Sequence, residues 1–144
     1  MADLRVVHEQ DETLGEDGDT NRRVLATNVT VADSLLSTGR GLMFRSTLPD
    51  EFALVMEVGG DTLSPFTDGP PRQLVHMLFV RMPLDVIWLD DSEVVQVSQL
   101  QPWRGIGMAR ADRILELPAG NADGVSVGDR VVVEDADGVS LGAE

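Results

Sequence analysis

Three charged residues that stand among apolar neighbours are the side chains that could do chemistry in this chain. Asp85 begins an apolar run, Glu116 lies inside another, and Arg45 follows a Gly-Leu-Met-Phe segment. An isolated buried charge is costly, so we expect the three residues to meet in one compensated cluster. Such a cluster would be either a structural network or the polar floor of a ligand site.

Metal chemistry has few candidate ligands in this sequence. His8 and His76 are the only histidines, and there is no cysteine, which excludes disulfides, Cys-ligated zinc and a thiol nucleophile. His76 with Asp85 and Glu116 could form a His-carboxylate site, although the three residues lie on separate predicted strands. We therefore expect neither a metal nor a cofactor.

Two short glycine motifs do not fit the sites that they resemble. The pattern G-x-S-x-G occurs at residues 124–128 and 138–142, but no histidine follows either serine, as a nucleophile elbow requires. Gly105-Ile106-Gly107 begins a dinucleotide fingerprint, but Arg110 occupies the place of the third glycine. We expect the first motif to form turns and the second a flexible loop.

The chain has 144 residues, enough for a single domain that buries an apolar core without metal or disulfide support. Its net charge of -14 excludes nucleic acid as an expected partner, because phosphate binding depends on basic side chains. The apolar stretch Leu74–Leu89 is interrupted by charges and a proline, which excludes a membrane span. No signal peptide is evident at the N-terminus, so a cytoplasmic monomer is expected.

The acidity has a global cause or a local one. Asp and Glu total 25 and recur through every loop, whereas a surface for one cationic partner would concentrate them. All 11 basic residues are arginine. In about 1 M salt the Debye length shrinks to about 3 Å, which removes most of the self-repulsion. We therefore interpret the composition as that of a protein from an extreme halophile.

Apolar runs rich in β-branched residues dominate the chain and predict a mainly β fold, a compact single-domain β-barrel or β-sandwich. Residues 9–21 are acidic and poor in large apolar side chains, which predicts a wide hairpin loop. Asp90, Asp91 and Ser92 predict a tight hairpin. One short helix is expected at 32–38 and a helical turn between Pro118 and Gly124. The expected strands are 4–8, 23–29, 53–58, 74–80, 84–89, 93–100, 113–117 and 130–134.

Five short blocks occur in order along the chain: Gly41-Leu42-Met43-Phe44-Arg45, His76-Met77-Leu78-Phe79-Val80, Met82-Pro83-Leu84-Asp85-Val86-Ile87, Leu115-Glu116-Leu117-Pro118-Ala119-Gly120 and Gly128-Asp129. In this order they make the chain similar to the domain of unknown function 192 (DUF192) family over Val24–Val133, most of the chain. The second block, which begins with His76, resembles the archaeal branch, whereas many bacterial members have a Trp-Met-Lys-Asn-like string there.

The resemblance implies a mainly β domain and supplies no reaction. Our preferred interpretation is a small noncatalytic binding or accessory module, with a small molecule or a protein as its partner. The alternative is an enzyme of hydrolase type, in which Asp85 and Glu116 act as a carboxylate pair while Arg45 or His76 stabilises charge. The candidate pocket residues in either case are Met43, Arg45, His76, Met77, Asp85, Glu116 and Gly120.

Overall fold

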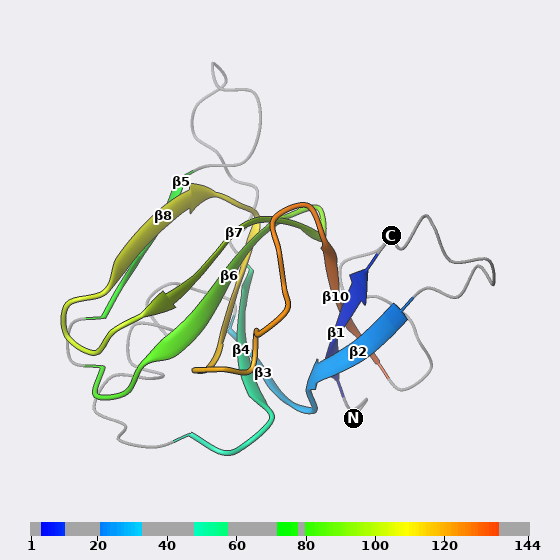
Figure 1. The fold of residues 1–144 in the computed structure, drawn as a ribbon, viewed down its shortest axis with the longest axis horizontal. Helices are drawn as coiled ribbons and strands as arrows, with labels where there is room; N and C mark the ends of the chain where they lie inside the picture. The colour runs from blue at the N-terminus through cyan, green and yellow to red at the C-terminus, as the bar shows by residue number, and fades with distance from the viewer. Residues whose placement is uncertain (1–3, 11–20, 33–47, 58–71, 78–79, 136–144) are drawn as a thin grey trace.

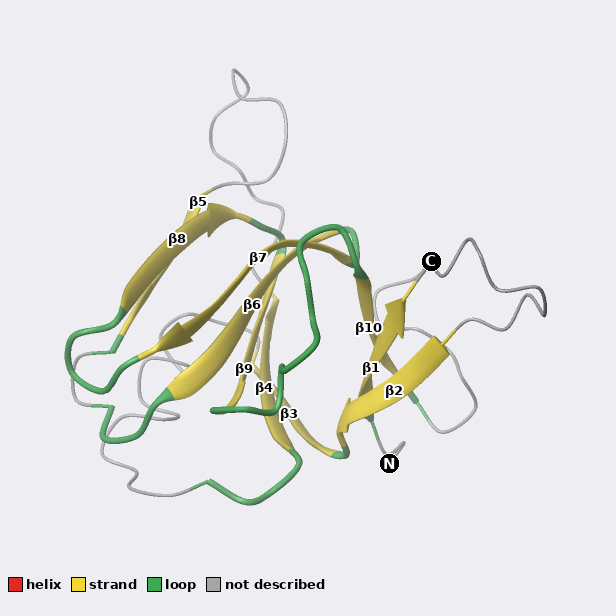
Figure 2. Cartoon of the chain, in the orientation of Figure 1, coloured by secondary structure: helices red, strands yellow, loops and turns green. Residues whose placement is uncertain are grey.

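The structure is a computed structural model that describes residues 4–10, 21–32, 48–57, 72–77 and 80–135. The described residues form ten strands in two sheets and contain no helix, which confirms the mainly β expectation (Figures 1 and 2). The strands are β1 (Arg5–Gln10), β2 (Asn21–Ala26), β3 (Asn28–Ala32), β4 (Phe52–Glu57), β5 (Arg72–His76), β6 (Leu84–Asp90), β7 (Glu93–Leu100), β8 (Ile106–Arg110), β9 (Arg113–Pro118) and β10 (Arg130–Glu134).

The larger sheet is strongly curled because its two edge strands are consecutive in the chain. Its order is β2-β1-β10-β7-β6-β9-β4-β3, and Thr27 alone joins β2 to β3. The N–H groups of Thr27 and Asn28 both donate to the carbonyl of Glu51 at 3.0 Å, which holds this junction against the start of β4. The pairing of β3 with β4 is parallel, and the other strand pairs among the described residues are antiparallel.

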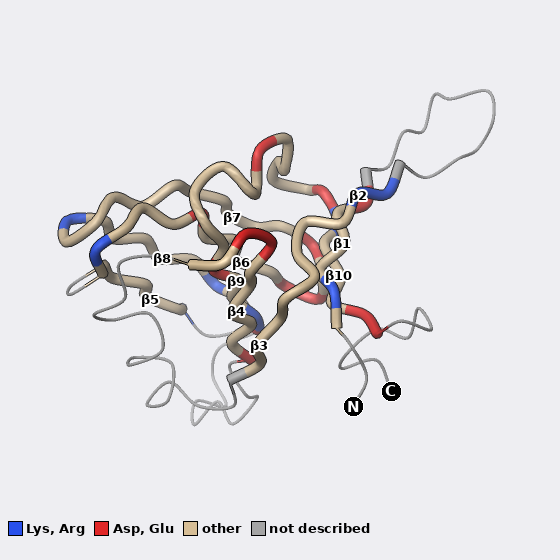
Figure 3. Tube along the Cα trace, turned by 90° about the horizontal axis from the view of Figure 1, so that it is seen from below, with Lys and Arg blue, Asp and Glu red and all other residues tan. Residues whose placement is uncertain are grey.

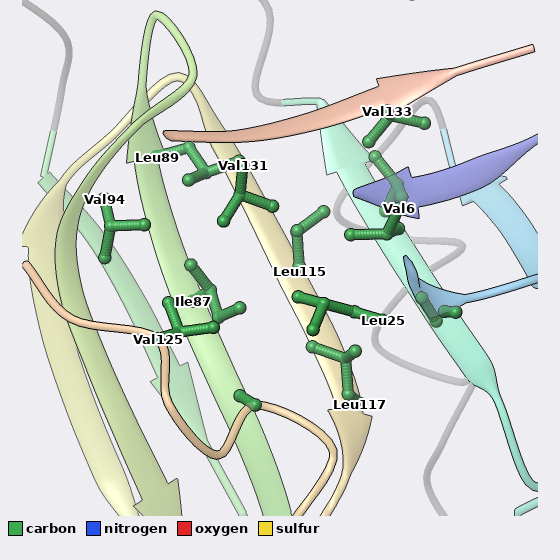
Figure 4. Packing of buried hydrophobic residues seen from close by; sticks show 14 residues of the cluster. Val6, Leu25, Ile87, Leu89, Val94, Leu115, Leu117, Val125, Val131 and Val133 are labelled. Carbon is green, nitrogen blue, oxygen red and sulfur yellow. The ribbon is translucent and has the colours of Figure 1, made fainter. Parts of the chain in front are cut away.

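One apolar core fills the concave side of the curled sheet. Alternate residues of a strand point to opposite faces, so one set of side chains from each strand reaches this interior. Figure 4 shows side chains of β1, β6, β9 and β10 converging there. The cluster includes Val6, Ile87, Leu89, Val94, Leu115, Leu117, Val131 and Val133, which are buried.

A second apolar core lies on the outer face of the sheet, beneath a two-stranded ribbon of β5 and β8 (Figure 1). The indole ring of Trp88 is fully buried under this ribbon, and its Nε1–H donates to the carbonyl of Gln73 at 3.1 Å. A Cβ on Gly107 would stand 2.5 Å from the indole ring, so this position of β8 needs glycine. The two strands thus lie close to the sheet and cover the apolar side chains on this part of its outer face.

The tight hairpin expected at 90–92 is confirmed. Asp91 and Ser92 form a two-residue loop between β6 and β7, with φ values of 50° and 70°. Positive φ at both positions is typical of the turns that match the twist of paired strands. The wide hairpin expected around residues 9–21 is supported by the antiparallel pairing of β1 with β2, while residues 11–20 lie outside the described part.

Three local expectations need correction. The strand expected at 23–29 is two strands, because the chain bends at Thr27 to pass from one sheet edge to the other. The flexible loop expected at 105–107 instead leads directly into β8, which begins at Ile106, and the absence of a side chain at Gly107 allows close packing on Trp88. The helical turn expected after Pro118 is a series of turns closed by N–H groups of Asn121, Asp123 and Val125. Of the helix expected at 32–38, Ala32 ends β3 and the remainder lies outside the described residues.

Candidate functional site

Asp85, the second residue of β6, is a buried carboxylate that is held by three hydrogen bonds. Its Oδ2 accepts from the N–H groups of Gly120 and Ala122, both at 2.9 Å. Its Oδ1 accepts from the side-chain amide of Gln99 on β7 at 3.3 Å. Hydrogen bonds to a charged acceptor are stronger than neutral ones, so this carboxylate fixes the segment that follows β9 against β6 and β7.

The segment from Pro118 to Val125 can present its N–H groups to Asp85 because it is a series of turns. Gly120 and Gly124 have φ values of 95° and 88°, a conformation that glycine adopts without strain. Within this series of turns the N–H groups of Gly120 and Ala122 point inward, toward the carboxylate. Gly120 is therefore brought together with Asp85, as expected for two residues of one site.

A pocket of about 230 Å³ opens beside Asp85, between the ends of β6 and β7 and the turn segment. Gln99 and Asp123 add polar groups to its wall, while Val97 and Ala122 add apolar surface. Gln99 is paired with Asp85 in the strand register, which explains why both side chains reach the same pocket. Gln99 and Asp123 could not be predicted as pocket residues from the sequence, because only the β6–β7 register and the course of the turn segment bring them here.

Glu116 has entirely different surroundings. It lies at the centre of β9, and its direct cross-strand neighbours are Leu54 on β4 and Val86 on β6, both buried in the outer core. The side chain of Glu116 is itself buried. Burial raises the pKa of its carboxyl from 4.5 to about 7, because the charged form loses hydration that these apolar neighbours do not replace.

The expected cluster of Arg45, Asp85 and Glu116 is not formed, because Asp85 and Glu116 lie on opposite faces of the sheet. Val86 is the direct partner of Glu116, and it follows Asp85 immediately, so its side chain points to the other side of β6. Asp85 faces the side of the concave core, and Glu116 faces the outer core. The two carboxyls thus cannot act as a pair on one substrate. Met43 and Arg45 lie outside the described residues.

His76 and Met77 also point to different surroundings. His76 is exposed at the end of β5, opposite Ile106 of β8. Met77 is buried in the outer core, and its backbone N–H donates to the carbonyl of Gly105 at 3.0 Å. Because Asp85 and Glu116 are on opposite faces, the three-residue site of His76, Asp85 and Glu116 does not form. Among the described residues no group of three potential ligands could hold a metal ion.

Two separate polar contacts at the other end of the sheet were missed by sequence reasoning. His8 Nε2 lies 2.7 Å from Asp129 Oδ2, which also accepts from the N–H of Ser126 at 2.9 Å. The buried Glu134 accepts hydrogen bonds from Arg5 and Arg22. These partners lie at opposite ends of the chain, and Asp129 as one of the family's motif positions was the single signal that pointed to them.

The segment from residue 17 to 133 matches the model of the DUF192 family, described as "Uncharacterized ACR". A UPF0127 protein of Thermococcus sibiricus is 31% identical over 116 residues, which cover 78% of this chain and 70% of that protein. A UPF0127 protein of Pyrococcus furiosus is 34% identical over 116 residues, covering 78% of this chain and 91% of that protein. Both relatives are archaeal, in agreement with the resemblance of the block at His76.

Two crystal structures have a similar fold. A "putative transcription regulator" from Sinorhizobium meliloti 1021 superposes with a TM-score of 0.64 at 22% identity, covering 94% of this chain and 95% of that one. A protein of unknown function from Novosphingobium aromaticivorans DSM 12444 gives a TM-score of 0.63 at 24% identity, covering 88% of this chain and 82% of that one. At these identities the likeness concerns the fold alone.

Proposed function

This chain belongs to the DUF192 family, and we propose that it is a small noncatalytic binding module whose ligand enters the pocket beside Asp85. The observation that carries the proposal is the fixed position of the Asp85 carboxylate. Two backbone N–H groups hold Oδ2, and a weaker bond from Gln99 is made to Oδ1. A carboxylate that is already oriented loses little further conformational entropy when a ligand binds to it.

The groups around the pocket favour a small cationic ligand that donates hydrogen bonds. Asp85 and Asp123 bring negative charge to the wall, and Gln99 adds an amide that can accept as well as donate. The apolar surface of Val97 and Ala122 suits a short aliphatic chain. An amine or guanidinium compound with an aliphatic stem would match both features.

Binding is favoured over the hydrolase alternative because the two carboxyls do not face one substrate. In a two-carboxylate glycoside hydrolase the acid and the base or nucleophile flank one scissile bond, with their carboxyl groups about 5 to 10 Å apart. Asp85 borders an open pocket, whereas Glu116 is surrounded by Leu54 and Val86 on the other face. The proposal therefore gives Asp85 the role of a binding group and assigns no catalytic residue.

The test is a titration of isotope-labelled protein with agmatine, followed by nuclear magnetic resonance at constant ionic strength. We expect amide shifts concentrated at Gln99, Ala122 and Asp123. Asp123→Asn should weaken binding about tenfold, which corresponds to about 1.4 kcal/mol. The matched control is Glu93→Gln, which removes the same charge at the far end of β7 and should leave the affinity unchanged.

Succinate serves as the comparison probe, because it has a similar length and the opposite charge. Shifts spread evenly over the acidic surface, or equal weakening by Glu93→Gln, would mean that agmatine is attracted only by the net charge. Either result rejects the pocket as a specific site. Saturable binding of succinate at Gln99 would reject the cationic ligand class.

We also propose that the protein is a monomer adapted to a salt-rich cytoplasm. The support is the net charge of -14 and the use of arginine as the only strongly basic residue. Raising KCl from about 0.1 M to about 3 M shortens the Debye length from about 10 Å to below about 3 Å, so the unfolding midpoint should rise. A midpoint that is flat or falls across this range would reject adaptation to salt. In the described residues no helix is long and apolar enough to cross a membrane.

A further inference from the structure

The outward side of the β5–β8 ribbon is an exposed apolar strip. Leu74 and Met108 are direct cross-strand partners and are 54% and 50% exposed. Ile106 follows on the same side at 64% exposure, and Trp103 in the loop that leads into β8 is 49% exposed. Single exposed apolar residues are ordinary, but four neighbours on one ribbon are typical of an interaction surface.

The strip is not needed for the core, because the ribbon already packs through its other side. Gln73 and Val75 alternate with the exposed residues of β5 and are buried against the sheet. Gly107 lies against the Trp88 ring in the same way on β8. The outward residues therefore add nothing to the outer core, and their apolar character calls for another explanation.

Arginines lie at both ends of this strip, and two of them face each other in an unfavourable like-charge pair. Arg72 and Arg110 are direct partners in the β5–β8 register, and both are exposed on the outward side. Like charges directly opposite each other destabilise a strand pair. Arg104 follows Trp103 at the other end of the strip. The ion pairs observed among the described residues engage other arginines.

Acidic residues are missing from this part of an otherwise acidic chain. No Asp or Glu occurs between Asp68 and Asp85, or between Glu93 and Asp112, although the chain contains 25 of them. These two segments contain β5 and β8. Figure 3 shows blue segments at the end of the molecule where β5 and β8 lie, while most red segments lie over the other strands.

We propose that this surface, which we call the ribbon face, docks an acidic segment of a partner protein that carries apolar side chains. The ribbon face comprises the outward residues of β5 and β8 together with Trp103 and Arg104. Aromatic residues, Met and Arg are enriched in protein interfaces, and acidic residues are depleted there. Carboxylates of the partner would pair with the arginines at both ends, and its apolar side chains would cover Leu74 and Met108.

Two other occupants fit the ribbon face less well. A second copy docked by a two-fold axis would place the same patch on both sides, so arginines would face arginines. A DNA duplex would supply negative charge but leaves Leu74, Ile106 and Met108 without apolar partners, and the net charge of -14 would repel it. An acidic protein segment satisfies the charged and the apolar residues together.

The test uses two displayed peptide libraries that differ only in charge. Both alternate apolar residues with charged ones, Asp and Glu in the first library and Lys and Arg in the second. We expect the intact protein to enrich peptides from the acidic library alone. Binding of an enriched peptide is then measured by fluorescence anisotropy, and Met108→Glu and Arg110→Glu should each weaken it about tenfold or more.

Val127→Glu is the matched control, since it places the same charge at another highly exposed apolar residue. It should leave the affinity of the peptide unchanged, and unfolding curves confirm that all the variants fold. The proposal is overturned if the acidic library yields no binder, or if binding does not respond to Met108→Glu. It is overturned equally if a DNA duplex binds through this face, or if sedimentation shows a dimer that Met108→Glu dissociates.

Discussion

Two buried carboxyls, Asp85 and Glu116, lie on adjacent strands, one residue apart in the pairing register, and have different hydrogen-bonding surroundings. Asp85 accepts two backbone N–H bonds from the turn segment and a third bond from Gln99. Glu116 lies between Leu54 and Val86 on a strand that is paired on both sides. Backbone N–H groups inside a sheet are already used in the strand ladder, whereas those of a turn are available. The comparison teaches that a buried carboxyl can be hydrogen-bonded by the backbone where a turn supplies free N–H groups, whereas the cross-strand neighbours of Glu116 are apolar.

The largest effect is expected for Asp85→Ala. The substitution leaves the N–H groups of Gly120 and Ala122 without their acceptor, and each unpaired buried donor costs about 1 to 3 kcal/mol. The free energy of unfolding, measured by chemical denaturation, should fall by about 4 kcal/mol. Asp112→Ala is the control, because Asp112 also accepts a backbone N–H, from Asp91, but is exposed. Equal losses in the two variants would contradict a special role for Asp85.

Glu116 should make the stability fall as the pH rises. Its folded pKa of about 7 exceeds the unfolded value of 4.5, so the folded state holds its proton longer. The free energy of unfolding is highest below about pH 4.5 and falls as the pH rises through about 7, by about 3 kcal/mol in total from this group. Unfolding measured from about pH 5 to pH 8 should show this decline in the parent protein and much less of it in Glu116→Gln. Identical profiles for the two proteins would show that Glu116 is ionised in the folded protein over the whole of this pH range.

A smaller loss is expected when the ribbon is forced away from the outer face that carries Glu116. Gly107→Ala places a methyl group 2.5 Å from the Trp88 ring, and overpacking of this kind costs about 2 kcal/mol. Trp88→Phe provides the control, because a smaller ring makes room for the methyl group. The two changes together should cost less than the sum of the single changes. Strict additivity of the two would mean that the ribbon does not press on Trp88.

The smallest effect is expected for Gln99→Ala. The bond from Gln99 to Asp85 is long, at 3.3 Å, so its removal should lower the free energy of unfolding by about 0.5 to 1 kcal/mol. Gln101→Ala, an exposed amide just beyond β7, is the control and should have no measurable effect. A loss for Gln99→Ala as large as that for Asp85→Ala would mean that the side-chain amide, and not the turn, holds the carboxylate.

Much of the fold could be predicted from local patterns, and the errors have local causes. The β6–β7 hairpin was predictable because Asp90, Asp91 and Ser92 favour a tight turn between two apolar runs. Strand β8 was not, since Gly105 and Gly107 indicate a loop unless the Trp88 ring beneath Gly107 is known. The bend at Thr27 was missed because nothing in the continuous run around it shows that a sheet edge ends there.

The sequence by itself determined the mainly β class, the family and the identity of the charged residues that stand among apolar neighbours. It also named Gly120 and Asp85 among the candidate pocket residues, and the structure shows the hydrogen bond that joins them. Only the tertiary structure decided that Asp85 and Glu116 belong to separate environments, because strand register sets which face each side chain reaches, and a shift of one residue reverses it. The same holds for the ribbon face, whose residues are distant in the sequence and become neighbours only when β5 pairs with β8.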